Sequence, residues 1–375
     1  GNVLCTHTKI KSLNRKREEG PMLTPFTDAS PRLPQAEGWD DDLSVRYREL
    51  DALWVTHWTP KGGWQRGQLY EHPGATLDLS PGANVLHYGQ AVFEGLKAHR
   101  TQDDRIVLFR PIDNARRLRR SASRLKIPPL PVPAFLEAIQ AVVRANVRWV
   151  PGYGKGAFYI RPVLFGSGPT LGLSPASEYT FFVFGSPMGQ YMGGGRLIVL
   201  SAAHRAALHG TGSVKAAGNY AASLLPHETA VELGYADALY LDAQEDRYVE
   251  ELGGANFFAI LRDGTLVTPA LGSILPGITR DSLLTIAREV FGWITVERPL
   301  PIEEVLDNAA EAFYTGTAAV LSSVTTINYR GVDHAIGDGE PGPRAQMLRQ
   351  ALVEIQRRER ADAWDWVIDL PIEST

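Results

Sequence analysis

Segments typical of strands and of helices alternate along this chain without a regular strand–helix–strand rhythm, and this mixture most constrains the fold. Apolar residues at spacings of three and four predict helices over 114–126, 134–150 and 277–292. Apolar runs bounded by turn residues predict strands over 157–165, 178–185, 237–242, 247–252, 257–261 and 265–269, and two more within 311–329. We therefore expect an α/β protein of mixed α+β character rather than a doubly wound parallel sheet.

A glycine-rich stretch, "SPMGQYMGGG", divides the chain. A length of 375 residues suits two domains, and glycine with proline is typical of a linker. We expect a small α/β domain over 22–185, a linker over 186–197 and a larger domain with a β-rich core over 198–375. Residues 1–21 are polar and basic, which indicates a tail or an extended start.

Composition excludes several classes of protein. Cys5 is the one cysteine, so one chain can form neither a disulfide nor a thiolate zinc site, and we expect no metal. No apolar run approaches the ~20 residues that span a bilayer. The net charge of −4 gives no general attraction to nucleic acid or an anionic membrane. We expect a cytoplasmic protein with small-molecule partners.

One predicted helix carries a run of arginines opposite its apolar side. Ala115, Leu118, Ala122 and Leu125 form the apolar side, and the arginines are residues 116, 117, 119, 120 and 124. A nucleic-acid-binding face is one interpretation. A solvated helix face is the commoner case, and the acidic chain as a whole favours it.

A single lysine lies among small residues in "GTGSVKAAGNYAASL" (210–224). Lys215 is either an ordinary loop lysine or a nucleophile that must lose its proton to attack a carbonyl, for which desolvation or a nearby cation lowers the pKa. Small neighbours would let a flat ring approach the backbone. Tyr220, five residues later, could direct its hydroxyl at an oxygen of that ring.

A ring held in this way usually brings a phosphate group. Ile278 and Thr279 follow a glycine and open a helix, whose first N–H groups attract anions. Thr317 offers a hydroxyl in a tight turn, and Arg110 offers a planar fork at the end of a strand. Taken singly, each of these signals is weak, since a threonine is often only a cap and an arginine only a surface charge.

Two adjacent glutamates, Glu250 and Glu251, follow a strand pattern, and strand alternation should turn one of them inward. A buried carboxylate needs a partner, and a protonated ring nitrogen would serve. The alternative is a paired or exposed glutamate at a strand end. The histidines form no metal motif, and no glycine-rich loop follows a strand as a nicotinamide site requires.

The constellation resembles the branched-chain amino-acid aminotransferases, which are pyridoxal 5'-phosphate enzymes of fold type IV. The likeness runs from about residue 50 to the C-terminal end. It rests on eight segments in family order: "LHYGQAVFEGLKAHR", "LFRPIDNARRLRRSA", "FYIRPVLFGSGPTLGLSP", "SPMGQYM", "GTGSVKAAGNYAASLLP", "EELGGANFF", "ILPGITRDSLL" and "YTGTAAVLSSV". It implies a smaller N-terminal domain, a larger cofactor-binding domain, a homodimer, and transamination of leucine, isoleucine and valine with 2-oxoglutarate.

The resemblance also implies roles for individual residues. Lys215 would be the Schiff-base lysine and general base, Tyr220 would bond the phenolic oxygen of the cofactor, and Glu251 would face the pyridine nitrogen. Arg110, Ile278, Thr279 and Thr317 would contact the phosphate. Substrate contacts would come from the N–H groups of Thr317 and Ala318, from Phe93, Tyr159, Tyr191 and Trp54, from Arg161 behind Tyr159, and from Tyr88, Leu171 and Leu173 of the partner subunit. Lys97 matches the family's lysine in "FEGLK".

Other interpretations keep the fold but change the chemistry. A D-amino-acid aminotransferase or an aminodeoxychorismate lyase would use the same cofactor, and a regulatory protein would use none. The segments "YIRP" and "FEGLKAHR" favour the branched-chain enzyme. Three departures from the family stand out: the Cys-x-x-Cys pair is absent after the Thr-Ala turn, Gly254 stands where relatives may carry threonine, and Pro226 predicts a kink after Tyr220.

Overall fold

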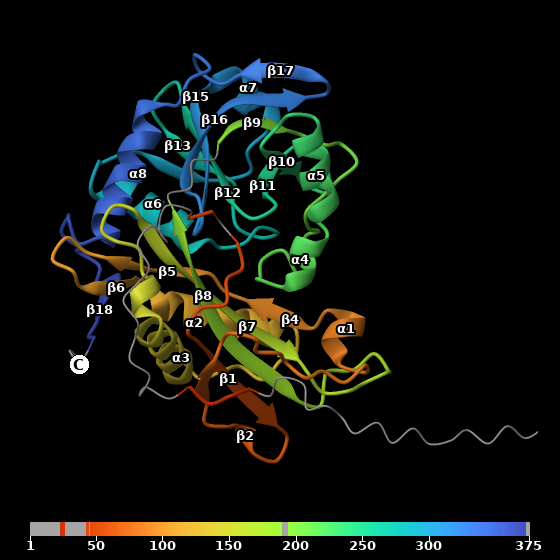
Figure 1. The fold of residues 1–375 in the computed structure, drawn as a ribbon. Coiled ribbons are helices and arrows are strands. Elements are labelled where there is room, and N and C mark those ends of the chain that lie inside the picture. Colours follow the sequence, from red (N-terminus) through yellow and green to blue (C-terminus); the bar gives the residue numbers. More distant parts are fainter. Residues whose placement is uncertain (1–22, 27–42, 45, 190–193, 373–375) are drawn as a thin grey trace, which may run out of the picture.

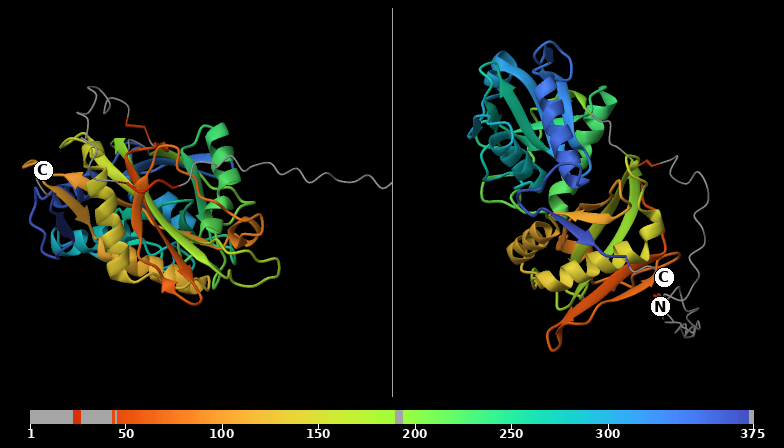
Figure 2. Two further views of the ribbon diagram at one scale, coloured as in Figure 1. Left: turned by 60° about the horizontal axis from the view of Figure 1, so that its bottom comes forward. Right: turned by 90° about the vertical axis from the view of Figure 1, so that its left-hand side faces the viewer.

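The computed structural model describes residues 23–26, 43–44, 46–189 and 194–372. Among these residues the strands form two nine-stranded sheets, which Figures 1 and 2 show stacked one above the other. The mixture of strands and helices expected from the sequence is confirmed. Within the described residues, we find no helix that combines the length and the apolar character needed to cross a membrane.

The first sheet has the strand order β18-β6-β5-β7-β8-β1-β2, with β3 paired to β1 and β4 paired to β7. The strands are β1 Ala52–Thr59, β2 Gly63–Trp64, β3 Gln68–Glu71, β4 Ala91–Phe93, β5 Leu96–Arg100, β6 Ile106–Phe109, β7 Gly156–Gly166, β8 Tyr179–Gly189 and β18 Val367–Leu370. The recorded pairings between these strands are antiparallel. The long β7–β8 pair forms the centre of the sheet.

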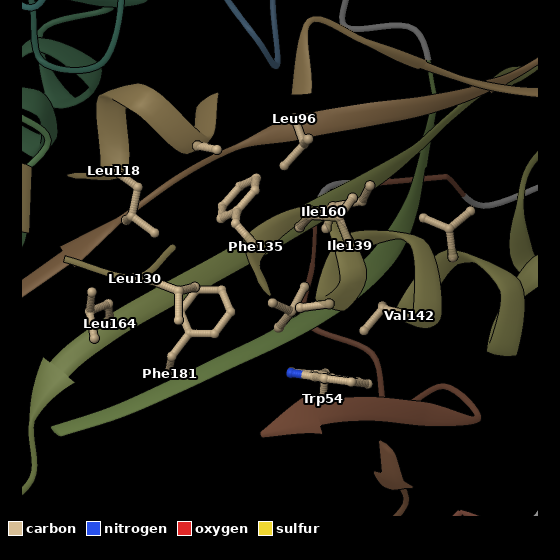
Figure 3. Packing of buried hydrophobic residues seen from close by; sticks show 14 of the residues in the cluster. Trp54, Leu96, Leu118, Leu130, Phe135, Ile139, Val142, Ile160, Leu164 and Phe181 are labelled. Atoms are coloured by element: carbon tan, nitrogen blue, oxygen red, sulfur yellow. The ribbon is translucent and has the colours of Figure 1, made fainter. Parts of the chain in front are cut away.

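Two helices cover one face of this sheet, α2 Pro111–Arg124 and α3 Val132–Ala145, while α1 Asn84–Tyr88 lies near one end. The apolar sides of α2 and α3 pack with the strands in one core, which Figure 3 shows. A short 3-10 helix, Val147–Trp149, completes the predicted second helix. Ala115, Leu118 and Ala122 of the predicted apolar side are buried and Leu125, the C-cap of α2, is half-buried, but Arg117 on the supposedly solvated side is buried too. The expectation of a solvated face was therefore wrong for Arg117, because this side chain forms an ion pair with the buried Glu94.

The second sheet closes on itself. Its order is β11-β10-β9-β16-β15-β12-β13-β14, and β11 also pairs with β12, so six of its strands form a ring. The strands are β9 Gly195–Ile198, β10 Asp237–Leu241, β11 Val249–Leu252, β12 Asn256–Leu261, β13 Leu266–Thr268, β14 Thr295–Glu297, β15 Ala309–Gly316, β16 Val320–Tyr329 and β17 Val332–Ala335. The helices of this half are α4 Ala217–Ala221, α5 Leu224–Glu232, α6 Ile278–Glu289, α7 Ile302–Asn308 and α8 Pro343–Gln356.

One apolar cluster joins the two sheets. It combines Val107 of β6 and Val367 of β18 with Phe258 of β12, Leu283 of α6 and Leu348 of α8. Burial of a shared apolar surface holds the sheets against each other, so side chains from both can meet in the space between them. The functional site lies there.

Three expectations about chain breaks can now be compared with the fold. The predicted linker overlaps the end of β8 and all but the last residue of β9, and residues 190–193 lie outside the described residues, as do residues 1–21. The domain limits stay a prediction, and the C-terminal strand β18 pairs with β6 of the first sheet. Instead of a kink at Pro226, the structure has two helices, with a break at Ala222 and Ser223. Pro226 therefore falls in the first turn of α5, where its missing N–H is tolerated.

The packing of α3 gives a test of the first core. Ile139 is fully buried in it, so Ile139→Ala should lower the free energy of unfolding by about 2–5 kcal/mol through lost apolar burial and the cavity left behind. Ile294→Ala is the matched control, because that side chain is 70% exposed, and its effect should stay within about 0.5 kcal/mol. Denaturant unfolding measures both, and equal losses would contradict this packing.

Candidate functional site

Lys215 lies between the two sheets, just before α4. The backbone around it is fixed from the first half of the chain, since Phe93 N donates to Lys215 O at 3.2 Å and Lys215 N donates to Ser121 Oγ at 3.0 Å. Its Nζ donates to Tyr220 Oη at 2.7 Å. The same ammonium lies 4.8 Å from the ring centre of Phe93. The structure therefore aims a half-buried amine and a phenol at one point, as their spacing predicts.

Glu251 lies in β11 with its carboxylate fully enclosed. Asn256 Nδ2 donates to Oε2 at 2.8 Å, while Leu275 N donates to Oε1 at 3.0 Å and Arg205 pairs with Oε1 at 2.7 Å. Burial raises the pKa of Glu251 to about 7, although Arg205 and the Leu275 N–H act to lower it. The carboxylate is thus held in place and can change its charge near neutral pH.

The expectation that only one of the two glutamates turns inward is wrong, because both are buried. Glu250 points to the other face of β11, where Ser273 donates to Oε1, and burial raises the pKa of this carboxyl group. The strand is covered on both faces, so alternation separates the two side chains without exposing either.

A pocket gathers most of the predicted cofactor residues. Lys215, Tyr220, Glu251, Ile278, Thr279 and Thr317 line it, together with Arg117, Arg205, Gly254, Ala255, Asn256, Leu275, Gly277, Thr315 and Gly316. Gly277 is the N-cap of the twelve-residue helix α6, which begins at Ile278 without a side-chain cap. The first N–H groups of a helix have no acceptor within it and favour an anion. A Cβ on Gly277 would come within 2.1 Å of Asn256 Oδ1, so glycine is needed for this close approach.

Arg117, not Arg110, is the α2 arginine that lines this pocket. Two of its guanidinium nitrogens bind Glu94, with distances of 2.7 Å to Oε1 and 2.8 Å to Oε2. A third nitrogen reaches Pro276 O at 3.3 Å, just before α6. Asn114 Nδ2 also donates to Glu94 Oε2 at 2.8 Å. Neither Glu94 nor Arg117 was predicted as a site residue from the sequence. Six arginines of similar appearance occur within 110–124, and nothing in the sequence indicates which of them pairs with Glu94.

Arg110 lies at the outer side of the α6 N-terminus. Its Nε pairs with Asp113 at 2.8 Å and its Nη1 pairs with Asp281 at 2.7 Å. The guanidinium also lies over the Trp366 ring at 4.9 Å. Arg110 is therefore occupied by two carboxylates and, in the part of the chain that the structure describes, is not among the residues lining the pocket.

Arg205 is a second residue that the sequence analysis did not single out. It precedes the Lys215 loop, is almost fully buried, and combines its ion pair to Glu251 with Nε donated to Gly253 O at 3.3 Å. Its guanidinium lies 5.8 Å from the Tyr220 ring centre. The sequence indicated that an inward glutamate needs a partner, but nothing in it pointed to Arg205 as that partner.

The turn between β15 and β16 contributes Thr317 to the lining of the pocket. Thr317 Oγ1 donates to Gly95 O at 3.1 Å, and Lys97 Nζ donates to Ala318 O at 3.0 Å. Val320, at the end of the turn, has a φ of 59°. Two side-chain contacts between the halves thus fix a turn of the second half, which comprises residues Thr317–Ala319.

Aromatic side chains line the other side of the Lys215 amine. Phe93 packs edge-on against Tyr220 with ring centres 4.7 Å apart. Arg161 donates through Nη2 to Tyr159 Oη at 3.0 Å and lies over the Phe93 ring at 4.9 Å. A Cβ on Gly95 would come within 2.4 Å of Tyr159 Oη. Phe93, Tyr159 and Arg161 therefore form one apolar wall with a cation behind it.

The other expected substrate residues have three different outcomes. Trp54 is buried in the core of the first sheet (Figure 3), so its place in the pocket was wrong: β1 packs this ring inside the core. Tyr88 donates to Leu171 O at 2.6 Å, and Leu171 and Leu173 are 87% and 91% exposed, away from the Lys215 pocket of their own chain. Tyr191 lies outside the described residues.

Gly254 leaves open space beside Tyr220. A Cβ there would approach the nearest Tyr220 ring carbon at 3.9 Å, which is ordinary contact. The position can therefore hold a side chain, and the glycine widens this side of the pocket.

Comparison with known proteins gives one consistent group. The family model of class IV aminotransferases ("Amino-transferase class IV") matches residues 91–327. The chain is 42% identical to branched-chain-amino-acid aminotransferase 5, chloroplastic, of Arabidopsis thaliana over 366 residues, covering 96% of this chain and 86% of that protein. It is 40% identical to the branched-chain-amino-acid aminotransferase of Helicobacter pylori over 345 residues, covering 90% of this chain and 100% of that protein.

Solved structures agree with these sequence relatives. The branched-chain amino acid aminotransferase of Escherichia coli has a TM-score of 0.73 at 28% identity, covering 86% of this chain and 100% of that one. The branched-chain amino acid aminotransferase of Thermobaculum terrenum, solved in its PLP-bound holo form, has a TM-score of 0.72 at 25% identity, covering 87% of this chain and 100% of that one.

The Glu94–Arg117 pair yields a stability prediction. Glu94→Gln should lower the free energy of unfolding by about 3–5 kcal/mol, because it leaves a buried guanidinium without its counter-charge. Glu303→Gln is the matched control: its pair with Arg247 spans 3.6 Å between half-exposed side chains, so the loss should stay below about 1 kcal/mol. Urea unfolding measures both, and a Glu94→Gln variant as stable as the control would show that the buried pair is unimportant.

Proposed function

This chain belongs to the class IV aminotransferases and, within them, to the branched-chain-amino-acid aminotransferases, and from that premise we propose that it transfers the amino group of L-leucine, L-isoleucine or L-valine to 2-oxoglutarate. The products are the branched 2-oxo acid and L-glutamate. The observation that carries the proposal is the arrangement of Lys215, Tyr220 and Glu251 in one pocket that opens at the N-terminus of α6.

The pocket fits pyridoxal 5'-phosphate, the cofactor of fold type IV aminotransferases. An amine suited to an aldehyde, a phenol suited to a phenolic oxygen, a buried carboxylate suited to a ring nitrogen and a helix N-terminus suited to a phosphate all line it. When bound, the cofactor supplies a ring that accepts electrons from the substrate's α-carbon. Lys215 would hold it covalently through Nζ.

Glu251 would keep the ring nitrogen protonated. Its Oε2 accepts one recorded hydrogen bond, from Asn256, which leaves it capacity for a further donor. Arg205 and the Leu275 N–H hold Oε1 from behind, so the carboxylate cannot rotate away without losing two partners. All three partners of this carboxylate, Arg205, Asn256 and Leu275, come from the second half of the chain, which therefore positions it.

The phosphate would lie between Arg117 and the first turn of α6, with Thr317 beside it. Arg117 already spans from Glu94 to the Pro276 carbonyl that precedes α6, so it is fixed at the required place. This assignment replaces Arg110, because Arg117 lines the pocket and Arg110 is not among its described lining residues. A helix N-terminus and a guanidinium together suit a doubly charged phosphate.

Lys215 would also serve as general base at the substrate's α-carbon. Once its amine is free, Nζ would take the α-proton and deliver it to the carbon attached to the cofactor ring, which lies on the other side of the transferred nitrogen. Tyr220 Oη lies 2.7 Å from Nζ and limits where that amine can point. The Phe93 ring beneath it excludes water from one side.

Substrate preference would follow from the wall formed by Phe93, Tyr159 and Arg161. The rings suit a branched aliphatic side chain, and the N–H groups of Thr317 and Ala318 would take the α-carboxylate. The second carboxylate of glutamate needs a cation or donors, and Arg161 with the Tyr159 hydroxyl supplies both within 3.0 Å of each other. One pocket can thus accept both substrates in turn.

We also propose that the protein forms a homodimer and works in a reducing compartment such as the cytoplasm. Tyr88, Leu171 and Leu173 form an exposed group at one end of the first sheet, with Tyr88 holding the Leu171 backbone. Exposed leucines of this kind are typical of an interface, which supports a place against the pocket of a second subunit. The single cysteine of the sequence supports the compartment.

The direct test is a panel of amino donors with 2-oxoglutarate as the acceptor. The purified enzyme should convert L-leucine, L-isoleucine and L-valine and should fail with D-alanine. Lys215→Ala should reduce turnover by at least about 10³-fold, because it loses both the attachment point and the base. Borohydride reduction followed by peptide mapping should place the cofactor on Lys215, and a label on another lysine would overturn the assignment.

A second test separates Arg117 from Arg110. The double variant Glu94→Gln/Arg117→Gln removes the cation without leaving an unpaired carboxylate and should weaken cofactor binding by about tenfold or more, since a charge-assisted hydrogen bond is lost. Arg110→Gln should leave cofactor affinity nearly unchanged. Spectroscopic titration of the apoenzyme with pyridoxal 5'-phosphate measures both, and the reverse order would return the phosphate to Arg110.

A further inference from the structure

A cavity of about 500 Å³ lies beyond the Thr317–Ala319 turn, between β5, the start of β7 and α8. In the described part of the chain it shares no lining residue with the pocket around Lys215. Its polar lining comes largely from groups that can donate hydrogen bonds. These are Lys97, His99, Gln346, Arg349, Gln350, Gln356 and Arg357.

His99 is the least expected member of this lining. It is 5% exposed, and neither Nδ1 nor Nε2 has a hydrogen-bond partner among the described residues. The alternation of β5 places Leu96 and Ala98 in the core of the first sheet, while Lys97 and His99 face the cavity. Buried polar atoms are nearly always paired, so two orphan nitrogens facing a cavity indicate a missing partner.

Positive charge around the cavity is not balanced by its own lining. Lys97, Arg349 and Arg357 face it, and so do Glu354 and Glu359. Glu354 is already paired with Arg360, which does not line the cavity, so the three cations face Glu359 as the one carboxylate without such a partner among the described residues. Glu354 accepts from Arg360 and Gln350 at 2.9 Å, and Glu359 accepts from Tyr153 at 2.8 Å.

The pKa values of Lys97 and His99 are lowered chiefly by burial and further by the neighbouring cations. Burial, with the charges of Arg349 and Arg357, lowers the pKa of Lys97 to about 7. Burial, with Lys97 and Arg357, lowers the pKa of His99 to about 3, so its ring is neutral and offers one N–H donor. An anion in the cavity would relieve the repulsion that disfavours both cationic forms.

We propose that this cavity is a binding site for a small organic dianion, a dicarboxylate or a phosphomonoester, held by Lys97, His99, Arg349 and Arg357. The volume suits a small metabolite, and guanidinium forks suit carboxylate and phosphate equally. The site goes beyond the proposed transamination, whose substrates and cofactor use the Lys215 pocket.

Binding at this site would be felt at the carboxylate-binding turn. Lys97 Nζ donates to Ala318 O at 3.0 Å, so the same ammonium touches the cavity and the turn. A dianion competes for that ammonium and loosens the turn. The affinity for the amino-acid substrate should therefore fall when the cavity is filled.

Calorimetry of the holoenzyme with inorganic phosphate, and separately with succinate, tests the proposal. The cofactor already fills the phosphate position near Arg117, so one saturable phosphate site is expected elsewhere. Arg349→Gln and His99→Leu should each weaken that binding by about tenfold, the loss expected for one charge-assisted or buried hydrogen bond. Arg116→Gln is the matched control, with a side chain 64% exposed on α2, and should bind like the wild type.

Each outcome decides the matter. Only binding that Arg349→Gln weakens belongs to this cavity, because the Lys215 pocket can also take a dicarboxylate. Within that binding, a higher affinity for succinate assigns a dicarboxylate, and a higher affinity for phosphate assigns a phosphomonoester. Absence of saturable binding, or equal affinity in all variants, would overturn the site. Saturating phosphate should raise the KM for L-leucine in the wild type and not in Arg349→Gln, and an unchanged wild-type KM would overturn the link to the turn. Calorimetry needs no turnover, so failure here leaves the proposed transamination intact.

Discussion

The buried ion pair between Glu94 and Arg117 holds the functional region together. Glu94 follows β4 of the first sheet, Arg117 belongs to α2, and the same guanidinium reaches the carbonyl that precedes α6 of the second half. Burying two charges is costly unless each is fully satisfied, and here Asn114 supplies a further hydrogen bond. The hydrogen bond from Arg117 to the Pro276 carbonyl links this pair, which lies in the first half of the chain, to the second half, so the residue that charges the pocket also helps to place the two halves.

The pocket separates its charges along its length. Glu251, held by Arg205 and Asn256, provides an anionic end within the second sheet. Arg117 and the opening of α6 provide a cationic end, and Lys215 lies between with its amine directed by Tyr220. A ligand with a basic ring nitrogen and a phosphate tail would match this polarity in one orientation only. Orientation is therefore set before any chemistry takes place.

The turn after β15 is the point at which two cavities meet. Gly95 and Lys97, both from the first half of the chain, fix it through Thr317 and the Ala318 carbonyl. The Lys215 pocket lies on one side and the cavity lined by His99 and Arg349 on the other. The Lys97 ammonium donates to the turn beside the Lys215 pocket and also lines the second cavity. A ligand in the second cavity would therefore act on the turn directly, without any change in the sheets.

The sequence by itself determined the mixed class of the fold and most strands and helices. Its resemblance to the fold type IV aminotransferases implied the grouping of Lys215, Tyr220, Glu251, Ile278 and Thr279, which line one pocket. The fold-type-IV architecture expected from its resemblance is confirmed by the solved relatives. Strands and helices depend on short-range spacing, whereas the grouping of Lys215, Glu251 and Ile278, which are far apart along the chain, followed from the family order of the motifs. Only the tertiary structure decided that Arg117 rather than Arg110 faces the pocket, that Arg205 pairs with Glu251 and that Trp54 belongs to the core. The physical reason is that burial of a charge or a ring depends on partners from distant segments, and a run of similar arginines does not indicate which one finds a buried carboxylate.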